Sequence, residues 1–208
     1  MDEVKEISST NEKNESSFFA TVSRMKYINR WALMRNTREE NLSEHSLEVA
    51  MIAHALCVIG NVRYGQKLDA EHAAMIGLYH DASEIITGDM PTPIKYYNPS
   101  IKEAFKDIEN KANRKLLDKL PEDLRAAYED IFFKDGSCAY EWRLVKAADK
   151  LSALIKCYEE EKTGNREFSK ARETIEQSVG KYVAEFPEVA DFVREFMSAY
   201  AKTLDELS

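Results

Sequence analysis

One of the four histidines in the sequence, His80, is followed directly by Asp81 and, three positions later, by Glu84. An imidazole and two carboxylates at this spacing can bind a metal ion or transfer protons. Because residues three or four positions apart are neighbours on a helix, the three side chains are expected to converge. His45 lies upstream in the first turn of another expected helix, and Asp149 lies downstream in KAADKL. Two imidazoles and two aspartates are therefore candidates for one shared site.

A set of two histidines and two aspartates is typical of a site for a divalent transition metal such as Mn, Co, Zn or Fe. Ca and Mg instead prefer shells of oxygen ligands. The alternative is that His80 is a half-buried core histidine, that Asp81 is a turn residue, and that Asp149 pairs with Lys146 or Lys150 at the surface. Composition alone leaves both interpretations open.

A cationic segment precedes these residues. Its sequence from 24 to 38 is RMKYINRWALMRNTR, and its basic residues are Arg24, Lys26, Arg30, Arg35 and Arg38. An arginine fork can bind phosphate through two hydrogen bonds, and Trp31 beside Arg30 offers a flat apolar surface for a base or a sugar. The alternative is a solvated basic face with Trp31 in the core.

The composition excludes several classes of protein. A chain of 208 residues can form one domain with a substantial core. The net charge of -8 argues against binding to a nucleic-acid polymer, which rests on Lys and Arg contacts to phosphates. Three cysteines that are widely spaced indicate no disulfide framework, so we expect a reducing cytoplasmic location.

Apolar residues recur at helical spacing along most of the chain, which predicts an all-α protein with no strand. Helices are expected at 18–29, from 43 to a stop at 60–61, from 70, from 99 after an Asn-Pro start, at 140–162, and on both sides of 186–187. The segment TGDMPTP at 87–93 is expected to be a loop. The face of the 43–59 helix expected to be buried consists of Leu47, Ala50, Met51, His54, Ala55 and Val58.

The two termini and the longest apolar stretch indicate the domain limits and the targeting of the chain. The N-terminus has acids where a signal peptide needs basic residues, so residues 1–16 are expected to form a flexible extension before one domain at 17–208. The longest apolar stretch, 49–59, is shorter than the roughly 20 residues of a membrane span. We therefore expect no membrane partner.

The order of the ligand candidates and four segments of the sequence resemble a known family. The order His45, His80-Asp81 and a distant Asp149 resembles that of the HD-domain metal phosphohydrolases. More specifically, INRWALMRN, ENLSEHSLEVAMIAHAL, LYHDASEIITGDMPTPIKYYN and LVKAADKLSALIKC are similar to segments of the bacterial HD-domain 5'-deoxynucleotidases. The resemblance implies a single-domain helical bundle of the HD type that hydrolyses deoxyribonucleoside 5'-monophosphates to deoxynucleoside and phosphate.

The same resemblance implies roles for individual residues. One divalent transition metal ion, such as Co or Mn, would be bound by His45, His80, Asp81 and Asp149. Arg30 would orient the phosphate, and Trp31 would border the sugar and help to select deoxyribose over ribose. The other implied substrate-binding residues are Asp81, Asp89, Met90, Pro91, Thr92 and Asp149.

Two acids match catalytic positions of the family. Glu84 matches the acid near the metal-bound water and is the candidate to orient or deprotonate that water. Asp89 is the candidate to protonate the departing 5'-oxygen or to contact the sugar. The division of roles between Glu84 and Asp89 stays open.

Other functions are compatible with the sequence. The metal tetrad alone does not identify the substrate, so an HD hydrolase of a deoxynucleoside triphosphate or an alarmone-type nucleotide is one alternative. A non-catalytic helical interaction protein, using the acidic C-terminal helices, is another. The resemblance also suggests a homodimer, whose interface would be the helical face 175–196 unless that face packs on the core.

Overall fold

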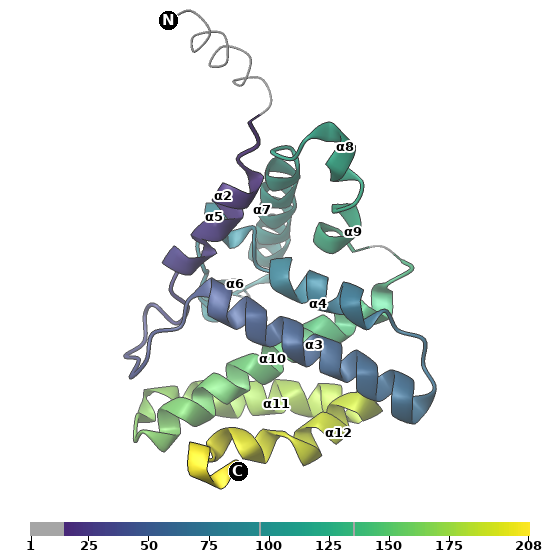
Figure 1. Cartoon of the computed structure of the whole chain (residues 1–208). Coiled ribbons are helices and arrows are strands. Elements are labelled where there is room, and N and C mark those ends of the chain that lie inside the picture. The colour runs from purple at the N-terminus through teal and green to yellow at the C-terminus, as the bar shows by residue number, and fades with distance from the viewer. Residues whose placement is uncertain (1–14, 96, 135) are drawn as a thin grey trace, which may run out of the picture.

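The computed structural model describes residues 15–95, 97–134 and 136–208, and this part of the chain is built from helices (Figure 1). The α-helices in chain order are α2 (Phe18–Val22), α3 (Leu42–Tyr64), α4 (Ala70–Tyr79), α5 (Glu84–Thr87), α6 (Thr92–Lys95), α7 (Pro99–Leu117), α8 (Glu122–Arg125), α9 (Glu129–Phe132), α10 (Ala139–Lys162), α11 (Ser169–Glu185) and α12 (Pro187–Glu195). The 3₁₀ helices are η1 (Ser23–Tyr27), η2 (Arg166–Phe168), η3 (Met197–Ala201) and η4 (Leu204–Glu206). Among the described residues, β-type pairing is limited to an isolated bridge between Asn29 and Asn41. The all-α prediction is confirmed.

Local capping signals placed several helices correctly. The Asp69 carboxylate accepts a hydrogen bond from the backbone of His72 at the start of α4, and Asn98 caps α7 in the same way. Helices α10, α11 and α12 also match their expected ranges. The expected first helix is instead divided into α2 and η1, and the Ser17 side chain makes no capping hydrogen bond. Of the expected N-terminal extension, residues 1–14 lie outside the described residues.

Helix α3 runs through the middle of the molecule and packs against α4, α10 and α12 (Figure 1). It begins one residue earlier than expected, because Asn41 and Glu44 form a reciprocal capping box. The expected stop at Gly60 is wrong, and the helix ends at Gly65, whose φ of 66° suits a left-handed cap. Gly60 is buried inside the helix against Gln66 and Leu68, so tertiary packing overrides its low helix propensity.

The buried face expected for α3 is mostly wrong. Leu47 and Met51 are 53% and 59% exposed, and His54 and Val58 are exposed as well. The buried side chains of this helix that form the core are Val49, Ile52, Ala53, Leu56, Cys57 and Ile59. The segment is apolar on nearly every side, so periodicity could not identify which face is covered.

Helix α3 is also long and apolar enough to cross a membrane, with a mean hydropathy of 1.4 over 18 residues. The apolar stretch 49–59 therefore underestimated the apolar length of this helix. Within the described ranges, α3 is the one helix that could span a membrane by length and composition. However, 56% of that window is buried inside the protein. A helix that is apolar all round and covered by neighbouring helices is typical of a protein core.

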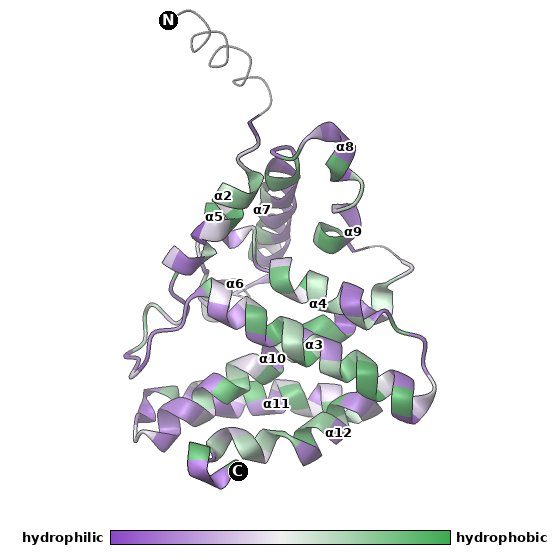
Figure 2. Ribbon diagram, in the orientation of Figure 1, coloured by the Kyte–Doolittle hydropathy of each residue, from purple (hydrophilic) through white to green (hydrophobic). Residues whose placement is uncertain are grey.

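The main core lies between α3, α4, α10, α11 and α12 (Figures 1 and 2). The apolar face of 175–196 belongs to it, since Val179, Phe186, Val189 and Phe192 are all buried there. Packing on the core, rather than a dimer interface, therefore accounts for that face. A second cluster, which includes Phe18, Leu116 and Phe132, joins α2, α7 and α9.

Candidate active site

Three helices bring the four expected metal ligands together. His45 lies in the first turn of α3, His80 and Asp81 directly follow α4, and Asp149 lies in the middle of α10. One ligand atom from each of His45, His80 and Asp81 lies within 4.8 Å of the others. Asp149 Oδ1 is 3.3 Å from His45 Nε2. Asp149 also forms an ion pair with Lys150 at 2.9 Å. This is one of the two pairs expected under the alternative interpretation, but Asp149 makes it while lying beside His45.

A close approach of two helices sets the distance between the histidines. Gly77 of α4 lies against α3 so tightly that a Cβ there would be 2.7 Å from the Ala50 Cα. This contact lies less than two turns from either histidine, and the ring centroids of His45 and His80 are 5.3 Å apart. A glycine at this crossing is therefore required by the packing of the site.

The HD pair is not on the helix that the spacing predicted. Helix α4 ends at Tyr79, and the next residues form a turn before α5 begins at Glu84. In this turn the backbone N–H of Ala82 donates to Tyr79 and that of Glu84 donates to Asp81, both at 2.9 Å. Bonds between residues three apart tighten the chain to about three residues per turn. Asp81 and Glu84 consequently stay on the same side, as expected.

Outer hydrogen bonds determine which nitrogen of each histidine faces the site. His45 Nδ1 is 3.0 Å from Ser152 Oγ, and the Ser152 hydroxyl donates to Glu48 at 2.6 Å. Because the Ser152 hydroxyl proton is used for Glu48, Ser152 Oγ accepts a hydrogen bond from the Nδ1–H of His45. His80 Nδ1 is 2.7 Å from the Gly77 carbonyl oxygen, which can only accept. When either ring is neutral, Nε2 is therefore the nitrogen with a lone pair. Burial lowers the pKa of His80, but the charges of Asp81 and Asp149 outweigh burial and raise it.

These Nε2 atoms face carboxylate oxygens. His45 Nε2 lies 3.3 Å from Asp149 and 3.7 Å from Asp81, and His80 Nε2 lies 3.1 Å from Asp81. Both nitrogens are buried and have no hydrogen-bond partner of good geometry among the described residues. Burial, together with the Arg30 charge, lowers the pKa of His45 to about 4, so this ring is neutral at pH 7. Nitrogen lone pairs and carboxylate oxygens that face one another can bind a cation between them, and the donor set fits a divalent transition metal.

Arg30 is the basic residue of the cationic segment that reaches this cluster. Its side chain is 12% exposed, and Nη1 lies 3.4 Å from Asp81 Oδ2. Burial lowers the pKa of Arg30, but the surrounding carboxylates of Asp81, Asp149, Glu40 and Asp89 outweigh burial and raise it. The guanidinium is therefore charged.

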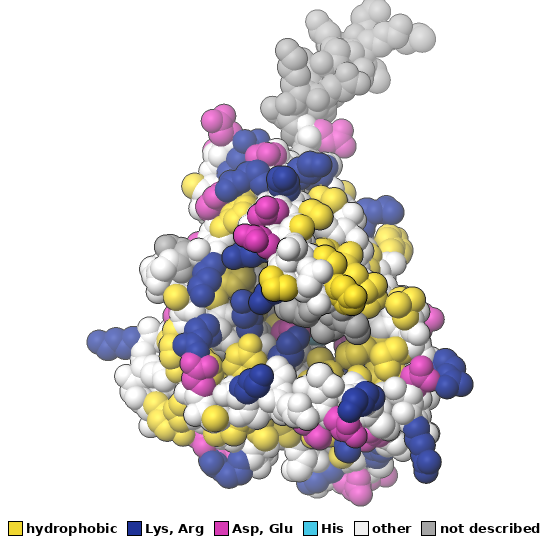
Figure 3. Space-filling model, turned by 180° about the vertical axis from the view of Figure 1, so that it is seen from behind, with side chains coloured by type: hydrophobic (Ala, Val, Ile, Leu, Met, Phe, Trp, Pro, Cys, Tyr) yellow, Lys and Arg dark blue, Asp and Glu magenta, His cyan; other side chains and the backbone are white. Residues whose placement is uncertain are grey.

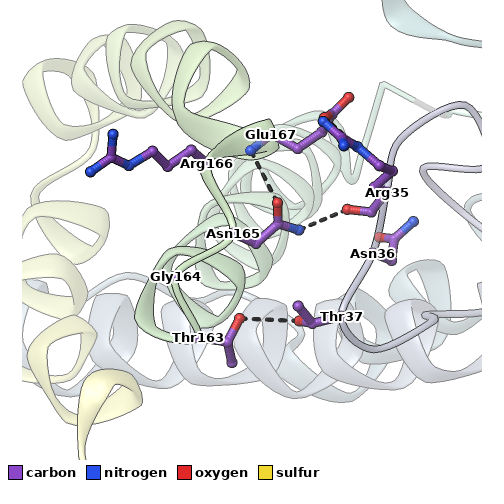
Figure 4. Close-up of a pocket in the computed structure, with 8 residues that line it drawn as sticks. All are labelled: Arg35, Asn36, Thr37, Thr163, Gly164, Asn165, Arg166 and Glu167. Carbon is purple, nitrogen blue, oxygen red and sulfur yellow. Dashed lines mark hydrogen bonds and ion pairs between the residues drawn. The ribbon is translucent and has the colours of Figure 1, made fainter.

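The other arginines near Trp31 point elsewhere. Arg35 binds Glu167 at 2.7 Å, and Arg38 lies 3.3 Å from Glu44 at the surface. A cavity of about 520 Å³ lies beside Arg35, between residues 35–37 and 163–167 (Figure 4). Apart from Arg35, it is lined by none of the residues singled out from the sequence for chemistry.

The two candidate proton-transfer acids lie at the start of α5 and in the loop that follows this helix. Glu84 is buried, and burial together with the charges of Asp81 and Asp89 raises its pKa to about 9. Burial also raises the pKa of Asp89, although Arg30 and a hydrogen bond from the Trp31 backbone oppose that shift. The charges of Asp81 and Arg30 therefore act on the pKa of both acids.

The expected substrate loop is residues 89–92. Gly88, with a φ of 73°, ends α5, and the Pro91 carbonyl oxygen accepts hydrogen bonds from Ile94 and Lys95, the last two residues of α6. Met90 and Pro91 are half-buried. Thr92 is the first residue of α6, and its side chain lies outside the described part of the structure. The substrate roles of these three residues stay predictions.

Sequence reasoning missed the residues behind the site. Glu40 contacts Arg30 and Trp31, while Ser152 and Glu48 hold His45. Ser152 carried a weak signal, because it is a polar residue in an apolar helix, three positions after Asp149. Glu40 and Glu48 carried no such signal, because the sequence does not distinguish them from acids on a solvated surface.

Comparison with known proteins gives matches over most of the chain. A family model described as 5'-deoxynucleotidase YfbR-like matches residues 17–200. A 5'-deoxynucleotidase of Erwinia tasmaniensis is 47% identical over 193 residues, which is 93% of this chain and 96% of that protein. A 5'-deoxynucleotidase of Yersinia pestis strain Pestoides F is 46% identical over 93% of this chain and 97% of its own.

Solved structures support the fold. An HD-domain phosphohydrolase from Listeria innocua superposes with a TM-score of 0.77 at 22% identity, covering 92% of both chains. A cyanophage S-2L HD phosphohydrolase bound to dA and one catalytic Zn²⁺ ion gives a TM-score of 0.59 at 18% identity, covering 88% of this chain and 95% of that one. The fold is that of the HD domain. With the family model and the relatives in agreement, the chain belongs to the YfbR-like 5'-deoxynucleotidase family.

Proposed function

We propose that this protein is a metal-dependent 5'-deoxynucleotidase that converts deoxyribonucleoside 5'-monophosphates to deoxynucleosides and phosphate. Membership of the family and the name of its relatives support the reaction. The observation that carries the proposal is the cluster of the buried His45 with the half-buried His80 and Asp81, and the Arg30 guanidinium 3.4 Å from Asp81. On the face opposite to that of Figure 1, Lys and Arg side chains gather around a hollow, which suits an anionic substrate (Figure 3).

His45, His80, Asp81 and Asp149 are the residues that would hold the metal ion. Such an ion lowers the pKa of bound water and neutralises charge on the phosphate. The mixed nitrogen and oxygen donors favour Co, Mn, Zn or a similar ion over Ca or Mg. Metal identity is a question for elemental analysis of the protein purified without added metal.

The chain's own groups supply binding and proton transfer. Arg30 binds the phosphate oxygens, because its guanidinium is charged, partly buried and adjacent to the metal ligand Asp81. Glu84 orients the attacking water, and Asp89 serves the leaving 5'-oxygen or the sugar. Burial raises the pKa of both acids, so each keeps its proton to a higher pH than a free carboxyl group and can donate it.

Trp31 is the proposed wall against the sugar. Its ring lies beside Phe168, with centroids 5.3 Å apart, so it has a rigid neighbour on the protein side. A rigid ring against C2' leaves no space for the hydroxyl of a ribonucleotide. Trp31→Ala should therefore narrow the difference in kcat/KM between deoxy and ribo monophosphates.

The experiment is a measurement of phosphate release from deoxy and ribo 5'-monophosphates and triphosphates. Chelator-stripped protein is assayed with and without added Co, Mn or Mg. We expect phosphate from deoxy monophosphates and only with a transition metal. Pyrophosphate or tripolyphosphate would instead identify a hydrolase of another nucleotide, and no release with any metal would favour a non-catalytic interaction protein.

We also propose that the protein is a homodimer that uses the outer face of α3. Exposed apolar side chains follow one another along this face, and Leu47, Met51, Val58 and Val62 are 53%, 59%, 39% and 78% exposed. A contiguous apolar stripe on a soluble domain is typical of an interface. Light scattering should give twice the chain mass of 23.9 kDa, and Val58→Glu should give the monomer. Ile108→Glu, at another exposed apolar position on α7, is the control.

A further inference from the structure

A single carboxylate oxygen contacts the two side chains proposed to recognise phosphate and sugar. Glu40 Oε2 accepts hydrogen bonds from Arg30 Nε at 3.3 Å and from Trp31 Nε1 at 3.1 Å. The Glu40 backbone carbonyl also accepts the N–H of Arg30 at 2.8 Å. The two ends of the 29–41 loop are joined in this way, next to the bridge between Asn29 and Asn41.

The contact is shielded from water. The side chains of Arg30 and Glu40 are 12% and 14% exposed. Burial raises the pKa of Glu40, and the Arg30 charge and the Trp31 hydrogen bond oppose that shift. Arg30 uses Nε for Glu40 and Nη1 for Asp81, and neither contact involves Nη2. Glu40 therefore directs the guanidinium toward the metal-ligand cluster without occupying its whole fork.

Trp31 needs such support because its backbone is strained. Its φ of 56° lies in the left-handed region, and it is the one non-glycine residue with a positive φ in the described ranges. The Trp31 carbonyl is held by Met34 and Asn36, and the indole N–H is held by Glu40. A bulky residue keeps this conformation only when its surroundings determine it, and such strain is concentrated at functional sites.

We propose that Glu40 is a positioning residue that couples phosphate recognition by Arg30 to sugar selection by Trp31. This inference rests on the proposed function and adds a residue that touches neither the substrate nor the metal. Loss of the carboxylate releases the indole N–H and the guanidinium Nε together. Selection of deoxyribose over ribose thereby depends on an acid located behind the recognition residues.

The test compares three variants. Glu40→Ala removes both contacts, whereas Glu40→Gln keeps an amide oxygen for Trp31 and removes the charge opposite Arg30. Glu39→Gln is the matched control, because Glu39 is the exposed neighbouring acid and accepts from Asn29 instead. Each variant is assayed for kcat and KM on deoxy and ribo monophosphates with the same base.

We expect Glu40→Ala to lower the deoxy-to-ribo ratio of kcat/KM by about tenfold, the effect of losing a hydrogen bond to a charged group. Glu40→Gln should keep most of that ratio but raise KM for the deoxy monophosphate, because a neutral partner binds Arg30 more weakly. Glu39→Gln should match the wild type. A ratio unchanged in Glu40→Ala, or lowered equally in Glu39→Gln, would overturn the inference.

A second measurement reports on Trp31 without activity. The chain has two tryptophans, so Trp142→Phe leaves Trp31 as the only indole. In that background, acrylamide quenching should increase in Glu40→Ala and stay low in Glu40→Gln, and equal quenching in both would contradict the coupling. If the wild type shows no preference for deoxy monophosphates, the proposed function fails instead, and quenching still tests the position of the indole.

Discussion

The ring nitrogen Nδ1 of His45 and the hydroxyl of Ser152 are 3.0 Å apart, and this contact joins α3 to α10. Ser152 is fully buried, and its hydroxyl donates a hydrogen bond to Glu48. Because this arrangement leaves Nε2 of His45 as the metal-facing nitrogen, Ser152→Ala should lower metal affinity. Loss of such an outer partner typically costs about 10- to 100-fold in affinity. Competition with a chelating dye measures it.

Ser46→Ala is the matched control for this change. Ser46 is next to His45 and is 2% exposed, but its hydroxyl has no hydrogen-bond partner within the described ranges. We expect the metal affinity of the Ser46→Ala protein to equal that of the wild type. Equal affinities for all three proteins would show that Ser152 does not orient the ligand.

Trp31 lies in a loop that Glu160 of α10 binds through Thr37. This contact should make the free energy of unfolding depend on pH. The Glu160 carboxylate accepts from the Thr37 backbone at 2.9 Å and from the Thr37 hydroxyl at 2.7 Å, and it also binds Lys156. Burial alone would raise the pKa of Glu160, but Lys156, Thr37 and Asn165 outweigh it and lower the pKa to about 2.

The sign of this dependence follows from the lowered pKa. Glu160 stabilises the fold fully above the usual glutamate pKa of about 4.3, and its contribution is lost as pH falls toward the folded value of about 2. Glu160→Ala should therefore cost about 3–5 kcal/mol at pH 7, as for other broken buried pairs. Urea unfolding from pH 7 to pH 3 should show the gap to the wild type narrowing. A gap that widens in acid would contradict this assignment.

A surface pair provides the comparison for Glu160. Glu173 contacts Lys170 at 2.9 Å, and both side chains are more than half exposed. Glu173→Ala should change the free energy of unfolding by no more than about 1 kcal/mol.

Gly77 should not tolerate a side chain. A Cβ at this position would lie 2.7 Å from Ala50 Cα and 2.9 Å from Ala50 N, and backbone atoms cannot move aside easily. We expect Gly77→Ala to destabilise the protein by about 1–3 kcal/mol or more, since it forces α3 and α4 apart. Thermal unfolding measures the loss.

The same substitution elsewhere should act in the opposite direction. Gly180 lies in α11, and a Cβ there would meet nothing within 4 Å. Gly180→Ala should stabilise the protein by about 0.5–1 kcal/mol, because alanine loses less backbone entropy in a helix. Equal destabilisation by both substitutions would refute the proposed role of the helix crossing.

Metal binding should stabilise the fold through the ligand cluster. A ligand at 100 times its dissociation constant adds about 2.7 kcal/mol to the free energy of unfolding. Asp149→Asn should reduce this gain, since it removes a charge 3.3 Å from His45 Nε2 while keeping the shape. Asp130→Asn is the control, because Asp130 faces His72, outside the ligand cluster. A full metal-induced shift in Asp149→Asn would exclude Asp149 as a ligand.

The sequence by itself determined the helical class, several helix starts and the four ligand candidates. Asp69 and Asn98 could be recognised as caps because their hydrogen bonds are to residues three positions away. The order of His45, His80, Asp81 and Asp149 was informative because few combinations of side chains bind transition metals. These are signals of local geometry and of chemical type, and both can be read from the chain.

The tertiary structure decided what depends on contacts between distant segments. It selected Arg30 from five basic residues, turned Leu47 and Met51 outward, and ended α4 before His80. It also assigned positions behind the site to acids such as Glu40 that resemble surface residues in sequence. A segment that is apolar on every side has no periodicity that identifies its buried face. The sequence around a charged residue does not show which distant residue it will contact. Those choices are made by the packing of α3 against α4 and α10, because burial is a property of the assembled helices.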